Sequence, residues 1–440
     1  MNPTCTPFDF DFSTESAQEA LRVIRRLRAA GFTAYLAGGC VRDALLNKHP
    51  KDYDVATDAT PESICDVFGR KRTLAFGASF GVIGVLPDRK LAAPRKRANA
   101  ATEHGEEAAI TKVEPTEVAT FRSDGVYLDG RRPDSVHFGN AAADAQRRDF
   151  TINGLFYDPA MGQIIDYVSG HDDLKRGVLR TIGDPDQRFG EDKLRMLRAV
   201  RFATTIDFEI EPRTAQSIRD KASEIVRVSG ERIGIEMRRT MSSENAYQGF
   251  EHLRALSLAA YVLPELENMD GDRLAQYFAH KRRRSFPSAL ACLLLASEHA
   301  LADLRSIAKR WKLSNEEKRI VTAAIHGAPV LSIAHKLAWS KVQPVLIDRD
   351  IAVVLDVASE CVRATGLESD GIQLVQKALS LPAMVLDPAP LLTGSDLAGL
   401  EIPAGPAYAK ILSHLRNQQL DGVLQTRDDA IRELRKHRWN

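Results

Sequence analysis

Two carboxylates stand one residue apart, at Asp52 and Asp54, in a run of strand-forming residues. Alternate residues of a strand point to the same face, so the two carboxylates would project together while Tyr53 and Val55 point to a buried face. Like charges on one face are costly unless a cation lies between them. Mg²⁺ shared with nucleotide phosphates is the usual arrangement, and an acidic surface strand is the alternative.

A strand, two glycines and a short helix precede this acidic pair. Thr33 to Ala37 predicts a buried strand, and Gly38 and Gly39 separate it from the helix. Glycines let a phosphate approach the backbone closely, and the first turn of a helix offers free N–H groups. Arg42 adds a cation nearby. We therefore expect Gly38, Gly39 and Arg42 to contact the triphosphate of a nucleotide, although a Gly-Gly pair alone is more often only a turn.

The two motifs together resemble the nucleotidyltransferase core of the DNA polymerase β superfamily, on the runs Gly38 to Asp43 and Asp52 to Asp54. More narrowly, they resemble the class II tRNA nucleotidyltransferases, or CCA-adding enzymes, and the related bacterial poly(A) polymerases. The resemblance implies that Asp52 and Asp54 are catalytic and hold the metal. It also favours Glu117 as a third catalytic carboxylate, for which a carboxylate at a strand edge is the alternative.

A third motif matches the R-R-D-F-T-x-N pattern of that family, in the run Arg147 to Asn153. Adjacent arginines can hold triphosphate oxygens, and Asp149 and Asn153 can bond ribose hydroxyls. Because Asp149 and Asn153 are four residues apart, we expect them on one helix face. Arg148, Asp149 and Asn153 are therefore predicted to bind the nucleotide, and a salt-bridged surface is the alternative.

The run Glu191 to Arg195 matches the E-D-x-x-R motif that reads the nucleotide in this family. Apolar spacing predicts one helix from Asp186 to Ala203, which would place Asp192 and Arg195 on one face. Cytosine and adenine both carry an exocyclic amine beside an unprotonated ring nitrogen, whereas uracil and guanine reverse these roles. A carboxylate and a guanidinium would thus accept C and A without a nucleic-acid template, with Arg198 supporting the base. An intrahelical salt bridge is the alternative.

The composition is that of an ordinary globular protein. Of 440 residues, 44% are hydrophobic and 27% charged, and the net charge is +1, so RNA contacts must come from local patches. The longest apolar stretch, around Ala289 to Ala296, is too short to span a bilayer. Five scattered cysteines without a C-x-x-C pair indicate a reducing compartment. We expect a cytoplasmic protein with no membrane partner, and the sequence carries no signal of its oligomeric state.

The elements predict an α+β fold, in which a polymerase β-like nucleotidyltransferase head of mixed sheet and helices precedes all-α neck, body and tail domains. We place the head at 1–160, the nucleotide-selecting neck at 161–265, the helical body at 266–386 and the helical, tRNA-binding tail at 387–440.

Three further segments carry expectations. Residues 88–113 have little apolar periodicity and predict a mobile insertion. Residues 122–133 resemble the flexible loop that helps this family switch from C to A addition. For the basic run His280 to Arg284, an RNA backbone contact and a solvated face both stay open.

The predicted function is template-independent addition of C and A to the 3′ end of tRNA. The implied partners are the tRNA acceptor end, CTP and ATP, and the implied cofactor is Mg²⁺, which would activate the 3′-hydroxyl and neutralise the departing pyrophosphate. The alternatives are a poly(A) polymerase, a partial enzyme that adds only the terminal A, and a non-catalytic RNA-binding protein. The intact carboxylate pair argues against the last.

Overall fold

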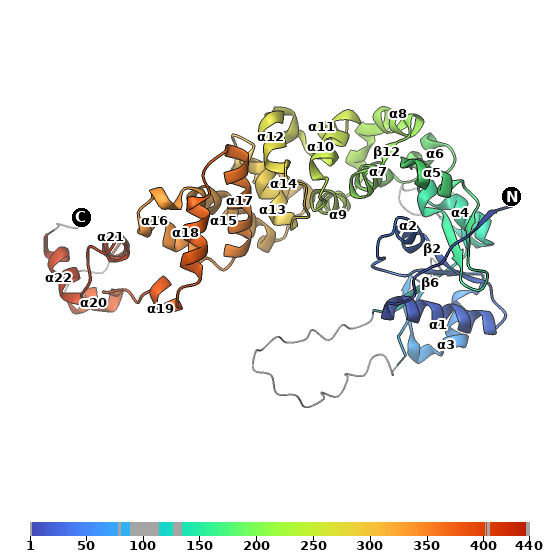
Figure 1. Ribbon diagram of the computed structural model, residues 1–440, viewed down its shortest axis with the longest axis horizontal. Helices are drawn as coiled ribbons and strands as arrows, with labels where there is room; N and C mark the ends of the chain where they lie inside the picture. The colour runs from blue at the N-terminus through green and yellow to red at the C-terminus, as the bar shows by residue number, and fades with distance from the viewer. Residues whose placement is uncertain are drawn as a thin grey trace. The chain divides into compact units, whose positions relative to one another are not determined.

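The structure is a computed structural model that describes residues 2–77, 81–88, 114–125, 134–400, 402 and 405–436. Its contacts divide the chain into two units, Met1–Val228 and Ser229–Asn440 (Figure 1). The first unit contains sheets and helices and the second is built from helices, which confirms the predicted α+β fold class. The finer boundaries predicted at residues 160, 265 and 386 stay predictions. The predicted insertion at 88–113 lies outside the described residues, apart from Asp88.

A mixed sheet forms the centre of the first unit. Its described strands run in the order β1 (Thr4–Pro7), β10 (Gln163–Asp166), β9 (Leu155–Asp158), β2 (Ala34–Ala37), β3 (Val55–Thr57), β6 (Thr116–Thr120), β5 (Val82–Val85) and β4 (Thr73–Gly77). Neighbouring strands are antiparallel except β3 and β6, which are parallel with Val55 opposite Val118. The chain therefore enters β3 and β6 at the same end of the sheet.

The described part of the first unit also contains helices and two smaller sheets. They are α1 (Glu15–Ala29), α2 (Gly39–Leu45), α3 (Pro61–Phe68), η1 (Arg70–Arg72), β7 (Arg122–Asp124), β8 (Val136–Phe138), α4 (Ala141–Arg147), η3 (Thr151–Asn153), α5 (Gly170–Arg176), β11 (Val178–Leu179), α6 (Pro185–Glu191), α7 (Leu194–Ile206), β12 (Glu209–Ile210), α8 (Pro212–Lys221) and η4 (Ala222–Arg227).

Alternation along the strands divides the buried residues between the two faces of the sheet. Tyr53, Val55 and Tyr157 join the large core that includes the inner faces of α1 and α3. Ala56 and Phe156 point the other way, into a smaller core against α4. A residue at position 52 or 54 has the same parity as Ala56. The acidic pair consequently lies on the α4 side, which α1 and α3 do not cover.

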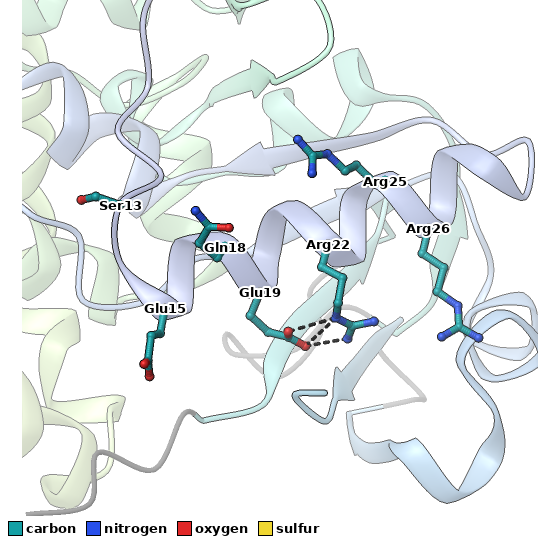
Figure 2. Close-up of a pocket in the computed structure, with 7 residues that line it drawn as sticks. All are labelled: Ser13, Glu15, Gln18, Glu19, Arg22, Arg25 and Arg26. Atoms are coloured by element: carbon teal, nitrogen blue, oxygen red, sulfur yellow. Dashed lines mark hydrogen bonds and ion pairs between the residues drawn. The ribbon is translucent and has the colours of Figure 1, made fainter. Parts of the chain in front are cut away.

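Helix α1 is amphipathic, as its sequence predicts. The Thr14 hydroxyl accepts a hydrogen bond from the Ala17 N–H at 3.2 Å and so begins the helix. Its inner residues Ala17, Ala20, Val23, Ile24 and Leu27 are fully buried against the sheet. Figure 2 shows the charged side of the same helix, where the Arg22 guanidinium donates to the Glu19 carboxylate at 2.9 Å. This helix therefore supports the sheet from the face opposite the acidic pair.

The single helix predicted from Asp186 to Ala203 is wrong. Helix α6 ends at Glu191 and α7 begins at Leu194, and Asp192 between them is extended, with φ −144° and ψ 108°. The Asp192 carboxylate accepts from the Leu194 N–H at 3.0 Å. Short acidic side chains that bond nearby backbone in this way compete with a continuous helix. Asp192 therefore lies between two helices rather than on the face of one.

The second unit is a series of packed helices. They are α9 (Gly230–Met241), α10 (Ala246–Ala255), α11 (Ala259–Val262), η5 (Pro264–Asn268), α12 (Gly271–Phe278), α13 (Phe286–Leu295), α14 (Ala300–Trp311), α15 (Asn315–Ser332), η6 (Ala334–Lys336), α16 (Trp339–Leu346), α17 (Ile351–Thr365), α18 (Asp370–Leu379), α19 (Ala383–Leu386), α20 (Gly394–Gly399), α21 (Ala407–Leu420) and α22 (Arg427–Lys436). Among the described residues, no helix is long and apolar enough to cross a membrane.

The basic run before α13 turns partly inward. Arg282 donates to Glu360 at 2.7 Å and to Asp356 at 2.6 Å, and the fully buried Arg284 lies 3.3 Å from Glu360. The Glu360 side chain is only 1% exposed, and these guanidiniums balance its buried charge. Two of the three arginines in the run are thus structural, which removes them from the predicted RNA-facing or solvated surface.

Candidate active site

The acidic pair lies just before β3 rather than within it, because the regular strand begins at Val55. The expected alternation nevertheless holds: Asp52 and Asp54 are exposed, whereas Tyr53 is 6% and Val55 0% exposed. The Ala37 N–H donates to the Asp54 carbonyl at 3.0 Å, which continues the pairing with β2. The segment is therefore extended and held to the sheet, and both carboxylates face outward from the α1 core.

Glu117 joins this pair through the parallel pairing of β3 with β6. Since Val55 lies opposite Val118, Asp54 and Glu117 precede opposed residues on adjacent strands, and Glu117 is also exposed. Burial by surrounding atoms and the charge of Glu117 raise the pKa of Asp54 to about 6, with a smaller contribution from Asp52, while the Arg148 guanidinium lowers it. The three carboxylates therefore repel one another across a solvent-accessible site.

This arrangement fits a hard divalent cation. The available donors are carboxylate oxygens, which Mg²⁺ prefers. Among the described residues, no three His, Cys, Asp or Glu side chains are grouped closely enough to hold a metal ion by themselves. Protein sites for Mg²⁺ commonly supply one or two carboxylates and leave the remaining positions to water and substrate phosphates. The exposed carboxylates at this edge of the sheet have the donor chemistry of such a site, and their role as metal ligands stays a prediction.

Gly38 and Arg148 meet beside the carboxylates. Gly38 has φ +74°, and a Cβ atom there would lie 2.6 Å from Arg148 Nη1, so only glycine fits. The Arg148 guanidinium donates to the Asn153 carbonyl at 3.1 Å and to the Asp144 carboxylate at 2.9 and 3.1 Å. Its effect on the pKa of Asp54 places the same guanidinium near the acidic pair. The predicted phosphate turn and the arginine motif are therefore adjacent in space.

Asp144 was not singled out from the sequence. Its side chain is 1% exposed, and it accepts from both Arg147 and Arg148. These two guanidiniums hold the pKa of Asp144 below its ordinary value although burial acts in the opposite direction. The available signal was its position three and four residues before two arginines. Asp144 orients the arginines of the motif rather than facing the site.

A second network joins α2, the R-R-D-F-T-x-N motif and α7. Asp149 accepts from Asn153 Nδ2 at 3.0 Å and from Arg198 at 2.7 and 2.8 Å. Asn153 Oδ1 in turn accepts from Arg42 Nη1 at 2.7 Å. Burial alone would raise the pKa of Asp149, but the charge of Arg198 and the hydrogen bonds hold it well below its ordinary value. Four predicted nucleotide-binding residues are thus in direct contact.

The predicted reason for one of these contacts is wrong. Asp149 and Asn153 do not lie on one α-helix face, because Arg148 and Phe150 are extended and residues Thr151–Asn153 form a 3₁₀ turn. The tight turn brings the Asn153 amide back onto Asp149, so the contact forms by another route. The four-residue spacing therefore predicted that Asp149 and Asn153 are close, but not the backbone conformation that brings them together.

Arg195 contacts Glu191 through its guanidinium and Asp192 through its backbone, where the Arg195 N–H donates to the Asp192 carbonyl at 3.0 Å. Its guanidinium forms an ion pair with the Glu191 carboxylate and donates to the Arg188 carbonyl at 3.0 Å. Arg188 contributes a second ion pair to Glu191, at 2.9 Å. The charge of Arg195 also helps lower the pKa of Asp149. Arg195 therefore borders the network, while the base-reading role of Asp192 and Arg195 stays a prediction.

The predicted flexible loop is described only in part, since residues 126–133 lie outside the described residues. Its beginning, β7, pairs antiparallel with β8. Residues of β7, α4 and α6 line a surface pocket that includes Asp124, Arg147, Arg188 and Glu191. The described start of this segment thus lies beside the residues that hold Arg195.

The first unit matches a known class of domain. Residues 34–180 match the family described as the poly A polymerase head domain, and residues 207–270 match one described as a probable RNA and SrmB-binding site of polymerase A. Residues 284–434 match a family described as tRNA nucleotidyltransferase domain 2. The sheet and its carboxylates therefore belong to a nucleotidyltransferase head of the poly A polymerase type. Enzymes with heads of this type generally use a divalent metal.

Full-length relatives narrow the class. The CCA-adding enzyme of Enterococcus faecalis is 31% identical over 95% of this chain and 95% of its own length. That of Limosilactobacillus fermentum is 33% identical over 95% and 97%, respectively. The structure of the Bacillus stearothermophilus CCA-adding enzyme in complex with CTP aligns with a TM-score of 0.73 and 26% identity, over 96% of this chain and 98% of that one. The chain belongs to the CCA-adding enzyme family.

Proposed function

We propose that this protein adds C and A nucleotides to the 3′ end of tRNA from CTP and ATP, without a nucleic-acid template, and releases pyrophosphate. The observation that carries the proposal is the parallel pairing of β3 with β6, which sets Asp54 beside Glu117 with Asp52 close by. Membership of the CCA-adding enzyme family supplies the product, and these carboxylates supply the chemistry.

Asp52 and Asp54 are the proposed metal ligands, with Glu117 as the third catalytic carboxylate. Bound Mg²⁺ would lower the pKa of the attacking 3′-hydroxyl and neutralise charge on the departing pyrophosphate. The carboxylates remain exposed, so the triphosphate and the tRNA end can both reach them. Burial and the charges of Glu117 and Asp52 together raise the pKa of Asp54, and a bound cation would offset both the lost hydration and the repulsion.

The guanidiniums beside the carboxylates are proposed to hold the nucleotide. Arg42 and Arg148, with the backbone at Gly38 and Gly39, would contact the triphosphate. Asp149 and Asn153 would contact the ribose from positions fixed by their own hydrogen bonds. A guanidinium carries five N–H donors, so each of these arginines can keep its protein partners and still bind phosphate. The network therefore preorganises the nucleotide site before substrate binds.

Base selection is assigned to Asp192 and Arg195, supported by Arg198. The ion pair with Glu191 fixes where the Arg195 guanidinium points, and the break between α6 and α7 leaves Asp192 outside either helix. A carboxylate and a guanidinium together match the amine and ring nitrogen of C and A and leave unpaired polar groups with U and G. We also propose that the neck at 161–265 selects the nucleotide, that the tail at 387–440 binds the tRNA body, and that the protein is cytoplasmic.

A direct test uses a tRNA transcript that lacks its last three nucleotides. With CTP, ATP and Mg²⁺, we expect extension by C, C and A and then arrest, read as product length on a sequencing gel or by mass spectrometry. Long A tracts from ATP alone would indicate a poly(A) polymerase. Extension only of a transcript that already ends in CC would indicate an A-adding enzyme, and no extension at all would refute nucleotidyl transfer.

Asp52→Ala tests the catalytic assignment. We expect loss of detectable incorporation without a fall in melting temperature, because the side chain is exposed and supports no core. Asp66→Ala, which removes an exposed carboxylate on α3, is the matched control and should retain full activity. Retained incorporation by purified Asp52→Ala would remove the acidic pair from the mechanism.

A further inference from the structure

Phe202 on α7 stands out because three guanidiniums gather on its ring. The Cζ atoms of Arg42, Arg198 and Arg201 lie 5.1, 5.4 and 3.8 Å from the ring centroid. All three distances are within the range in which a cation is attracted by the negative face of an aromatic ring. Phe202 itself is only 6% exposed, so the ring is shielded from water. An aliphatic residue of similar size would fill the space without attracting the cations.

Two of the three guanidiniums come from different parts of the proposed nucleotide site. Arg42 belongs to α2, beyond the phosphate turn, and Arg198 belongs to α7, beside the proposed base-reading residues. Hydrogen bonds connect the same two arginines a second time, because Arg42 donates to Asn153, Asn153 donates to Asp149, and Asp149 accepts from Arg198. Phe202 therefore completes a closed set of contacts that joins Arg42, near the proposed phosphate site, to Arg198, near the proposed base-reading residues.

A second aromatic residue, Phe150, holds the Phe202 side chain in place. Phe150 packs edge-on against Phe202, with centroids 5.7 Å apart and planes at 76°. Phe150 is fully buried and lies next to Asp149 in the chain. The aromatic platform and the carboxylate that binds Arg198 are thus anchored by neighbouring residues, and the platform cannot shift independently of the network.

We propose that Phe202 is a positioning residue that sets the spacing of Arg42 and Arg198 and thereby the affinity for the nucleotide. The inference rests on the proposed function, which supplies the roles of the two arginines. Phe202 touches guanidiniums and not the carboxylates that bind metal, so its loss affects substrate binding more than the chemical step. It also acts alike on every nucleotide, because it lies behind the arginines rather than against the base.

The test compares Phe202→Leu with Phe208→Leu. Phe208 is an equally buried aromatic residue, also 6% exposed, in the same unit and outside the network. We expect Phe202→Leu to raise KM for CTP and for ATP in equal proportion by about tenfold, which corresponds to about 1.4 kcal/mol. We expect kcat to stay within about threefold of the wild type. Phe208→Leu should leave both constants unchanged while lowering the melting temperature by a similar amount.

Restoring a ring face should restore binding. Phe202→Tyr keeps the aromatic surface and should return KM to within about twofold of the wild type. If Phe202→Leu does not fold, Phe202→Met, which is unbranched and flexible, replaces it in the same comparison. A merely structural role predicts that Phe202→Leu and Phe208→Leu behave alike, and equal KM values in these two variants overturn the proposal.

Titration calorimetry with CTP and Mg²⁺ in the absence of tRNA separates this inference from the proposed function. We expect the Kd for CTP to rise about tenfold in Phe202→Leu and to be unchanged in Phe208→Leu. A wild-type protein that binds CTP but extends no tRNA would refute the proposed function while this comparison still decides the role of Phe202. An unchanged Kd in Phe202→Leu refutes the positioning role, even if the wild type adds CCA.

Discussion

Replacing Asp54 with asparagine should stabilise the metal-free protein while it abolishes nucleotidyl transfer. The folded protein holds the pKa of Asp54 at about 6, above its ordinary 3.8, so the ionised form is unfavourable in the fold. A raised carboxyl pKa contributes stability that is present below about pH 4 and is lost as the pH rises through about 6. Asparagine stays neutral throughout. Asp54→Asn should therefore match the wild type below about pH 4, gain stability relative to it as the pH rises from about 4 to about 6, and exceed it by the full amount at pH 7.5.

The size of the effect follows from the same shift. A difference of one in pKa corresponds to about 1.36 kcal/mol, so the rise from 3.8 to about 6 would correspond to about 3 kcal/mol. Because the Asp54 carboxylate is exposed, solvent screening reduces this free-energy difference to about 1 kcal/mol. For a unit the size of Met1–Val228, this is about 2–4 °C in melting temperature. Glu117→Gln should reproduce much of the gain, since Glu117 is the strongest neighbouring charge, and Asp52→Asn should reproduce less of it.

The assay is thermal unfolding from about pH 3.5 to about pH 8, with and without Mg²⁺. Mg²⁺ should raise the melting temperature of the wild type, because a ligand that binds only the folded state stabilises it. It should leave the melting temperature of Asp54→Asn nearly unchanged. The difference in melting temperature between the two proteins should therefore shrink or change sign when the metal is added. Asp66→Asn, at an exposed carboxylate on α3, should follow the wild type in every condition.

Two results would refute this reasoning. If Asp54→Asn is no more stable than the wild type at pH 7.5 without metal, the carboxylates do not repel one another as the geometry implies. If Mg²⁺ stabilises the wild type and Asp54→Asn equally, the cation binds somewhere other than the acidic pair.

Three further substitutions test other parts of the structure. Gly38→Ala should lower kcat/KM at least about tenfold, because the added Cβ displaces the Arg148 guanidinium. Gly31 also has positive φ, but a Cβ there would meet nothing within 4 Å, so Gly31→Ala should leave kcat/KM unchanged. Equal losses in the two variants would argue against the close approach of Gly38 to Arg148. Asp149→Asn should lower stability at pH 7, and the wild type should lose that advantage only as acid protonates this carboxylate below about pH 4; urea titrations at several pH values measure it. Glu360→Gln should cost about 3–5 kcal/mol in urea unfolding, because it removes the carboxylate charge from the buried Arg284 and weakens the hold on the half-buried Arg282; Glu368→Gln is the exposed control.

The sequence identified the chemistry of the site because its motifs are local. Alternation at Asp52 to Val55 depends only on adjacent residues, and it held although the regular strand begins later than expected. The amphipathic spacing of α1 and the glycine pair at the start of α2 are likewise short-range patterns, and they predicted elements that support the site. The family was readable for the same reason, since each motif is a short run of the chain.

Local patterns misjudged the backbone where side chains compete with it. The apolar spacing from Asp186 to Ala203 suits one helix, but the Asp192 carboxylate bonds the Leu194 N–H and divides the helix in two. Apolar periodicity indicates which residues are buried, but it does not indicate where a side chain replaces a backbone hydrogen bond of the helix. For the same reason the basic run at Arg282 and Arg284 looked exposed, until Glu360 on a distant helix was found to bind both.

The sequence by itself singled out the residues that are proposed to carry the chemistry: the acidic pair, the glycine turn and the arginine motif. The tertiary structure alone decided how they combine, by setting Glu117 beside Asp54 and Phe202 behind Arg42 and Arg198. The physical reason is that side-chain identity and short spacing fix donors, acceptors and local facing. Strand register and ring stacking, in contrast, depend on which distant segments bury their apolar faces together.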